Sequence, residues 1–368
     1  MLARTFKTLA VATLIAGSIF SAVNAADFTI RAVANSNEND EDYDGLVVFK
    51  NYIESASNGA IGVEIYMGTQ LCSNGAECLQ GVASGNIDVY ISTSGGAAGL
   101  FPYVQVLDLP YLMADDRIAE DVLSGDFTRK LREMALEDSD NAIRLMTIGN
   151  TGGWRNFANT KHRVQTPEDL KGLKIRTVVA DLPQELVKAL GASPAPMPIM
   201  EVYDGLSKGV IQGVNIPFET LKTFRFAEVA KYVTSSWQVG NIYTFYVIMN
   251  KRSYAKLPPD LKEILDELAG EYKERFALMW NSIDFAGKRF AQEKGVKFID
   301  LTDDQVKKWK SVTAVVVDNY IKDMTAKGYS ESEIKGWISF LRERIDFWTN
   351  KQMEYRIPSP TGPEGMKQ

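Results

Sequence analysis

The chain has 368 residues, of which 45% are hydrophobic and 24% are charged, and its formal net charge is −6. This composition is typical of a soluble globular protein with two domains, and it argues against a disordered chain, a collagen-like repeat and a polytopic membrane protein. The negative charge argues against nucleic acid as a partner. One histidine and two cysteines are too few for a structural zinc site, which usually takes four such ligands, so we expect no metal site.

The first 25 residues have the features of a secretory signal peptide. Two basic residues precede an apolar segment from Leu9 to Phe20, and Val23-Asn24-Ala25 provides a cleavage site. An uncleaved membrane anchor is the alternative, but the apolar segment is shorter than the ~20 residues that a spanning helix needs. We therefore expect residues 1–25 to be removed during export, which changes the formal charge from −6 to −8.

The two cysteines are interpreted in the light of this export. Cys72 and Cys78 are separated by five residues that include a turn signal, Asn74-Gly75. In an oxidising compartment, such a close pair predicts a disulfide that closes the turn. A redox-active pair is the alternative, but the usual redox motif has two intervening residues rather than five.

From residue 28 to about residue 249, predicted strands and helices alternate. The periodicity of apolar residues predicts strands and helices at these places in chain order: strand 28–33, helix 43–56, strand 62–66, helix 77–84, and strands 87–91, 142–148, 173–177 and 243–249. This alternation, with short links marked by glycine, predicts a mostly parallel α/β sheet.

From Pro258-Pro259 onward the pattern changes to long helices. Apolar residues recur at helical spacing in residues 260–293, 302–327 and 330–355, which contain almost no proline. The last segment, residues 357–368, is rich in proline and glycine and is expected to be a loose tail.

No enzyme signature stands out in the sequence. Serine hydrolase chemistry needs a histidine base held by an acid, and His162 lies in a polar segment that we expect to be an exposed loop. The glycine-rich residues 94–99 lack the spacing of a dinucleotide fingerprint, but they follow a strand, where open α/β sheets bind ligands. The acidic stretch 35–44 does not have the spacing of a calcium loop, so we expect it to be solvated.

Several short motifs follow one another in a characteristic order. The clearest is Glu168-Asp169-Leu170-Lys171-Gly172-Leu173-Lys174-Ile175-Arg176, a helix start that leads into a strand ending with an arginine. The others lie at residues 67–71, 85–88, 106–112, 150–156, 190–198 and 201–213. In this order they resemble the solute-binding proteins of TRAP transporters, the DctP family. The resemblance covers essentially the whole mature chain.

The resemblance implies a bilobed α/β fold of the periplasmic-binding-protein kind (type II-like) with a long helix bracing both lobes. We expect lobe I in residues 26–150 with a returning segment near 235–255, and lobe II in residues 151–234. A helical part, residues 256–356, would pack on both lobes, and its first helix, 260–293, would be the brace.

The resemblance also implies a function. A protein of this family is a periplasmic receptor that is not an enzyme, uses no cofactor, and delivers a small organic anion to the TRAP permease in the membrane. We expect the anion to be a carboxylate or a sulfonate.

Two arginines are the first candidates for ligand contacts. In the family, the arginine that ends the strand, here Arg176, holds the anionic group of the ligand. A guanidinium stays charged, and its planar fork matches a carboxylate or a sulfonate with two parallel hydrogen bonds. Arg155 is the second candidate. Internal salt bridges are the alternative for both.

Five further residues are weaker candidates. The chain departs from the family after Gln212-Gly213, which leaves Asn215 and Phe218 as residues that either contact the ligand or only pack in the core. Asn35 and Ser94 are candidates for polar contacts from lobe I. Trp237 is as much a core residue as a pocket wall.

Two other functions remain as alternatives. One is an exported α/β hydrolase with paired carboxylates, for which acids of raised pKa in the cleft would speak. The other is a ligand receptor for a sensor protein.

Overall fold

We describe the fold from a computed structural model of the chain. The structure describes residues 26–93, 95, 102–110, 133, 140, 142–150, 155–235, 239, 241 and 243–356. The predicted signal peptide and the predicted loose tail both lie outside the described residues.

The described residues form two β-sheets, one in lobe I and one in lobe II, and strand β11 of the expected helical part joins the second sheet. Sheet A has the strand order β2-β1-β3-β10-β4, and sheet B has the order β11-β9-β5-β8-β6-β7. The strands of sheet A are β1 (Phe28–Ala34), β2 (Ile61–Met67), β3 (Val89–Thr93), β4 (Ile143–Asn150) and β10 (Thr244–Asn250). Those of sheet B are β5 (Asn156–Asn159), β6 (Lys174–Thr177), β7 (Ser193–Pro196), β8 (Gly213–Ile216), β9 (Tyr232–Thr234) and β11 (Lys297–Ile299).

Both sheets are mixed, so the α/β class is confirmed but the prediction of a mostly parallel sheet is wrong. In sheet A, β1 pairs in parallel with β2 and β3, whereas β10 is antiparallel to β3 and β4. In sheet B, β5 is antiparallel to β8 and β9, whereas β6 is parallel to β7 and β8. Because β10 lies between β3 and β4, the chain returns to sheet A after it has formed most of sheet B.

Local signals in the sequence explain where several helices begin and end. The helices are α1 (Glu41–Ala56), α2 (Gly75–Ser84), α6 (Asp181–Ala189), α7 (Val202–Ser207), α8 (Thr220–Thr223), α9 (Lys251–Lys256), α10 (Pro259–Glu293), α11 (Asp303–Ala326) and α12 (Glu331–Tyr355). Side chains of Asp40 and Asn74 accept backbone hydrogen bonds at the starts of α1 and α2. A capping box of Thr302 and Gln305 begins α11.

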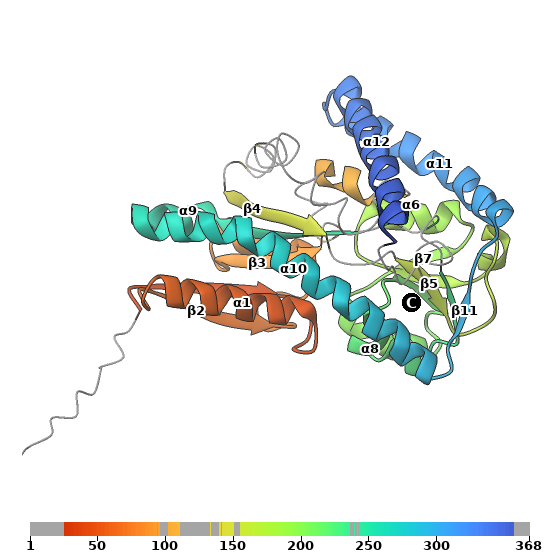
Figure 1. Ribbon diagram of the computed structural model, residues 1–368, viewed down its shortest axis with the longest axis horizontal. Helices are drawn as coiled ribbons and strands as arrows, with labels where there is room; N and C mark the ends of the chain where they lie inside the picture. Colours follow the sequence, from red (N-terminus) through yellow and green to blue (C-terminus); the bar gives the residue numbers. More distant parts are fainter. Residues whose placement is uncertain are drawn as a thin grey trace, which may run out of the picture.

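The long helix α10 connects the two sheets. It contacts α1 and β4 of the first sheet and α8 beside the second, and Figure 1 shows it running past both. At Gly287 the helix approaches lobe II so closely that a Cβ would lie 2.1 Å from the carbonyl oxygen of Phe218. The helix therefore fixes one side of both lobes. Within the described residues, no helix is long and apolar enough to cross a membrane.

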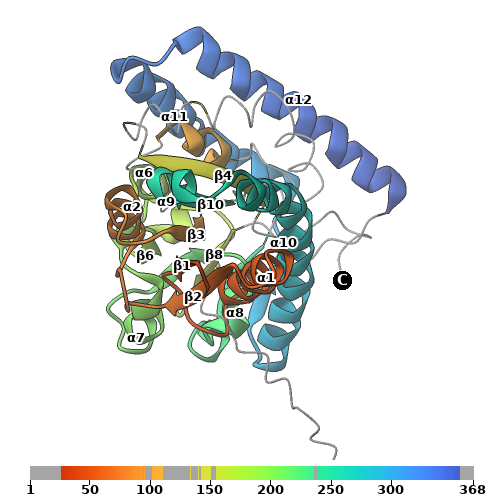
Figure 2. The same cartoon turned by 90° about the vertical axis from the view of Figure 1, so that its left-hand side faces the viewer.

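The other two C-terminal helices cover a different side of the molecule. Helix α11 packs on α6 of lobe II, and α12 packs on α11 and on the short 3-10 helix Pro102–Asp108; Figure 2 shows both along one edge. Trp309 of α11 is fully buried, its ring lies 5.4 Å from that of Phe157, and it donates a hydrogen bond to the carbonyl of Gln165 at 2.9 Å. Burial of such a large aromatic surface anchors α11 to lobe II.

Candidate ligand-binding site

A cavity lies between the two lobes. Its volume is about 120 Å³, roughly ten times the 10–15 Å³ that a single water needs. The ends of β1 and β3 and the starts of α1 and α2 line it from lobe I, and residues around β6 and β8 line it from lobe II. The lobes touch beside it: a Cβ on Gly95 would lie 2.9 Å from Val178. The cavity is therefore an interlobe site, where ligands of two-domain proteins commonly bind.

Arg176 reaches this cavity from strand β6. Its side chain is 4% exposed and lines the cavity. Its Nε and one terminal nitrogen donate hydrogen bonds of 3.0 and 2.9 Å to the carbonyl oxygen of Met197. These bonds hold the guanidinium in one orientation. Among the described residues, no carboxylate lies within ion-pair distance of Arg176, so the internal salt bridge that was its alternative is not formed there.

Arg155 lies next to the start of β5 and also lines the cavity. Its side chain is 8% exposed, and its guanidinium lies 3.6 Å from the centre of the Tyr243 ring. A terminal nitrogen donates a long hydrogen bond of 3.4 Å to the carbonyl oxygen of Asn215, while Nε has no partner among the described residues. The face of an aromatic ring attracts a cation, so Tyr243 favours the charged form of Arg155 and holds its guanidinium at this position.

The two arginines make this part of the cavity attractive to an anion. Burial, together with the positive charge of Arg155, lowers the pKa of Arg176 to about 9. Burial also lowers the pKa of Arg155, although Tyr243, Asp108 and Glu219 act in the opposite direction. Buried cations that repel each other are stabilised when an anion binds between them. The arrangement therefore suits a carboxylate or another planar or tetrahedral oxyanion.

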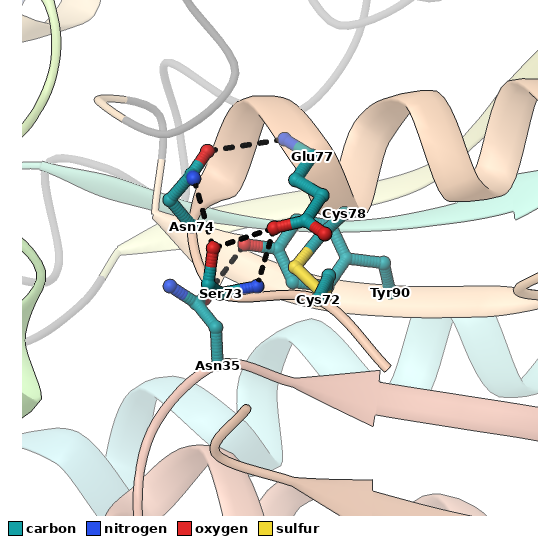
Figure 3. The surroundings of a disulfide bond; sticks show 7 residues. All are labelled: Asn35, Cys72, Ser73, Asn74, Glu77, Cys78 and Tyr90. Carbon is teal, nitrogen blue, oxygen red and sulfur yellow. Dashed lines mark hydrogen bonds between the residues drawn. A yellow bond between two sulfur atoms is a disulfide. The ribbon is translucent and has the colours of Figure 1, made fainter. Parts of the chain in front are cut away.

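The lobe I wall is built by the disulfide loop. Cys72 and Cys78 form a disulfide with Cα atoms 5.1 Å apart, which confirms the predicted bond. Between them, Asn74 begins helix α2 and lines the cavity together with Gly75 and Ala76. Figure 3 shows the bond beside the loop, where Glu77 accepts hydrogen bonds from the amide and hydroxyl of Ser73. The disulfide therefore fixes a segment of the cavity wall.

Replacing both cysteines by serine is expected to loosen this wall. A closed loop of this length stabilises the folded state by about 2 kcal/mol, which corresponds to a fall in Tm of roughly 4 °C for a protein of this size. The affinity for ligand should also fall because Asn74 would no longer be held in place. Calorimetry of the double variant, with and without ligand, measures both effects. An unchanged affinity would show that the loop takes no part in binding.

A second part of the lobe I wall is acidic, and here the expectation of a solvated stretch is wrong for three of its five acids; Glu38 and Asp44 are exposed as expected. Asp40, Glu41 and Asp42 are buried, and the first and last of them line the cavity. The acids are buried because they lie at the start of α1, which faces lobe II and α10. Burial raises the pKa of Asp40 to about 6 and, with the charge of Asp40, that of Glu41 to about 9.

Lobe II adds a further acid to this group. Glu219 is 3% exposed, lines the cavity, and donates its backbone N–H to Asp284 of α10 at 2.8 Å. Burial raises the pKa of its carboxyl, and so do the charges of Glu41, Asp40 and Asp284. Glu219 was not predicted from the sequence; its only signal was an acid three residues after the end of β8. The cavity thus holds both the arginines expected of a receptor and acids of raised pKa.

Of the remaining predicted site residues, one lines the cavity, two do not, and two lie outside the described residues. Asn35 lines the cavity and accepts a hydrogen bond of 2.7 Å from the hydroxyl of Tyr90. Asn215 is buried beside Arg155 but does not line the cavity. Phe218 also does not line it, because its ring is buried in the core of lobe II, 5.4 Å from Phe298. Ser94 and Trp237 lie outside the described residues.

Most of the apolar wall was not predicted either. It comes from short segments of lobe II that have no distinctive sequence pattern, and its residues are Val178, Val179, Met197, Pro198, Ile199, Ile216, Pro217 and Phe224. His162 lies elsewhere: it is exposed, and its Nε2 lies 2.8 Å from the carbonyl oxygen of Asp169.

Comparison with known protein families gives one clear match. The family model described as bacterial extracellular solute-binding protein, family 7 (DctP), matches residues 32–323. Among curated proteins, the 2,3-diketo-L-gulonate-binding periplasmic protein of Escherichia coli is 28% identical over 325 residues, which are 87% of this chain and 94% of that protein. A solute-binding protein of Sulfitobacter is 29% identical over 303 residues, 78% of this chain and 83% of that protein.

Solved structures have the same fold. A TRAP periplasmic solute-binding protein from Anaerococcus prevotii with bound D-glucuronate has a TM-score of 0.78 at 22% identity, covering 87% of this chain and 99% of that one. A marine metagenome TRAP solute-binding protein with bound 3-hydroxybenzoate has a TM-score of 0.78 at 21% identity, covering 88% and 100%. The family and these neighbours are substrate-binding receptors and not enzymes, so the hydrolase alternative is wrong.

Proposed function

Because the chain belongs to family 7 of the bacterial extracellular solute-binding proteins, the DctP family, we propose that it is the periplasmic receptor of a TRAP transport system. It captures a small organic anion in the interlobe cavity and delivers it to the membrane permease. The predicted signal peptide supports the periplasmic location.

One observation carries the proposed ligand class. Arg176 and Arg155 are both buried at the cavity, and no described carboxylate lies within ion-pair distance of Arg176. An unpaired buried guanidinium costs several kcal/mol, and an anionic ligand removes that cost. A neutral ligand of the same shape would leave the cost in place, so the site selects for charge.

The relatives support a carboxylate in particular. The Escherichia coli relative is named for a keto sugar acid, and the solved neighbours hold a sugar acid or an aromatic acid. These ligands share a carboxylate and differ in the rest of the molecule. We therefore place the carboxylate at the two arginines and assign the rest of the ligand to the other walls. A short sulfonate presents similar oxygens and is the second choice.

Delivery of the ligand to the permease requires that ligand binding changes the arrangement of the two lobes. Lobe I and lobe II both line the cavity, so a ligand that contacts both favours the arrangement in which the lobes lie together. The ligand shifts this equilibrium only by its differential affinity for the two arrangements. The permease would then recognise the ligand-bound arrangement.

Thermal-shift screening of the mature protein tests the proposal. The protein is first unfolded and refolded to remove any ligand carried from expression. The panel contains carboxylic acids, sulfonates and the amide of each acid as its neutral analogue. A ligand at 100 times its Kd stabilises the protein by about 2.7 kcal/mol, which is readily measured. We expect one or more acids to raise Tm and their amides to have no effect. Equal binding of acid and amide would contradict the proposed ligand class.

A further inference from the structure

The part of the cavity wall that lobe II supplies is largely apolar. Besides Arg176 and Arg155, only two of the described residues that line the cavity from lobe II are polar, namely Glu219 and Thr220. The hydroxyl of Thr220 already donates a hydrogen bond of 2.8 Å to the carbonyl oxygen of Pro217, and Glu219 is only 3% exposed. The other eight residues form the apolar wall defined above. A ligand that lies on lobe II therefore meets few polar side chains apart from the arginines.

Several side chains of the apolar wall are accessible from the cavity side. Val179 is 56% exposed, and Val178, Met197, Ile199 and Phe224 are half-buried. Apolar side chains that only pack in the core of this protein are almost completely buried. Partly exposed apolar side chains that gather around a cavity, with a few charged groups beside them, are typical of a ligand-binding site.

Lobe I offers these side chains no apolar partner. Of the nine described residues with which lobe I lines the cavity, seven have polar side chains, and the other two are Gly75 and Ala76. Closure of the lobes on an empty cavity would therefore bring apolar side chains against polar ones. A ligand with an apolar body removes the apolar wall from water instead, and this burial favours binding.

The polar groups of lobe I already have partners within the protein. Oδ1 of Asn35 accepts a hydrogen bond of 2.7 Å from Tyr90. Oδ1 of Asn74 accepts the backbone N–H of Glu77 at 3.1 Å, and its Nδ2 donates to the hydroxyl of Ser73 at 3.2 Å (Figure 3). These groups keep few hydrogen-bonding positions for a ligand. Lobe I can therefore serve a polar substituent but not a whole ring of hydroxyl groups.

The apolar wall begins next to the arginine that is expected to hold the carboxylate. Val178 follows Arg176 by two residues, and Met197, whose carbonyl oxygen orients the Arg176 guanidinium, belongs to the wall itself. The atoms of a ligand that follow a carboxylate at Arg176 thus lie within reach of the wall. Arg176 and Arg155 are the only cations among the described residues that line the cavity, which suits a ligand with one carboxylate.

We infer that the ligand is a monocarboxylate with an apolar body, aliphatic or aromatic, and not a polyhydroxylated sugar acid. This inference rests on the proposed function of an organic-acid receptor and narrows its ligand class. The carboxylate lies at the two arginines, and the body lies on the apolar wall of lobe II. A sugar acid has hydroxyl groups all around its body, and those that turn towards lobe II would lose their water without gaining a hydrogen bond.

Calorimetric titration of the refolded mature protein with matched pairs of acids tests the inference. Both members of a pair carry one carboxylate on a body of similar size, and only one member is polyhydroxylated. The pairs are hexanoate with gluconate, cyclohexanecarboxylate with glucuronate, and benzoate with 3,4,5-trihydroxybenzoate. In the pair that contains the tightest ligand, we expect the apolar acid to bind at least about 30-fold more tightly, because each buried hydroxyl without a partner weakens binding about tenfold. Its binding should also have a negative heat capacity change, the mark of buried apolar surface.

Two variants with the same chemical change test the wall directly. Val178→Thr/Val179→Thr places two hydroxyls on the wall with little change of shape. It should weaken binding of the apolar acid about tenfold, because these hydroxyls lose water when the acid covers them. The affinity for the hydroxylated partner should stay the same or rise. Val210→Thr is the matched control, because Val210 of lobe II is 55% exposed and does not line the cavity. It should change neither affinity.

The possible outcomes separate the inference from the proposed function. A hydroxylated acid that binds as tightly as its apolar partner, or more tightly, would overturn the inference, while the proposed function would stand. Wild-type affinity of the double variant for the apolar acid would overturn it too. If the double variant does not fold, the exposed position alone, as Val179→Thr, takes its place and should weaken binding about threefold. If no acid binds at all, the proposed function fails together with the inference.

Discussion

Replacing Arg176 by alanine is expected to reduce the affinity for the acid ligand by at least about 100-fold, because loss of one partner of a buried charge pair costs about 3–5 kcal/mol. Arg176 is 4% exposed and is held in place by two hydrogen bonds to Met197. Alanine removes both the positive charge and the guanidinium N–H groups that we expect to donate hydrogen bonds to the carboxylate of the ligand. Titration calorimetry of the refolded variant measures the loss.

Two further variants identify the cause of that loss. Arg176→Lys keeps a positive charge but not the planar fork, so it should recover only part of the affinity. Arg163→Ala removes an exposed arginine of lobe II and should leave the affinity unchanged. If Arg176→Ala bound the ligand as well as the wild type, the carboxylate would have to lie elsewhere in the cavity.

Replacing Gly287 by alanine is expected to destabilise the whole protein. A Cβ at this position would lie 2.1 Å from the carbonyl oxygen of Phe218 and 2.7 Å from the Cα of Glu219. Backbone atoms cannot rotate away, so α10 or the segment after β8 must move. Forced movement in a packed core typically costs about 1–3 kcal/mol, which lowers Tm by a few degrees. Ligand affinity should fall as well, because Pro217, Glu219 and Thr220, next to Phe218 in the chain, line the cavity.

The same helix offers a matched control. Gly270 of α10 is exposed, and a Cβ there would meet nothing within 4 Å. Gly270→Ala should therefore be neutral or stabilise the helix by up to about 1 kcal/mol, the difference in helix propensity. Thermal unfolding of the two variants side by side distinguishes helix propensity from packing. Similar Tm values for both would show that α10 does not pack tightly on lobe II.

The order of helices and strands was predictable because its signals are local. Alternating apolar residues predicted β1, and helical spacing predicted α10, α11 and α12 within a few residues of their actual bounds. The resemblance of the motifs to the DctP family is confirmed by the match over residues 32–323. Arg176 was predicted because it ends a recognisable motif, and it lies at the cavity.

Other parts of the site depended on contacts between distant segments. Asp40 and Asp42 were expected to be solvated because five acids in ten residues are typical of a surface loop. The folded chain buries both of them and places Asp40 near Glu219 of lobe II. Phe218 was expected either to contact the ligand or to pack in the core, and it packs in the core, whereas Phe224, which was not predicted, lines the cavity.

The sequence by itself therefore determined the two-lobe α/β class, the family, the disulfide and the arginine at the end of β6. Those features follow from periodicity, spacing and motifs, which a short stretch of chain carries within itself. Only the tertiary structure decided which acids are buried and which side chains form the cavity wall. The burial and the charge environment of these acids depend on contacts among lobe I, lobe II and α10. Glu219, for example, donates its N–H to Asp284, 65 positions away in the chain, and no local sequence pattern encodes such a long-range contact.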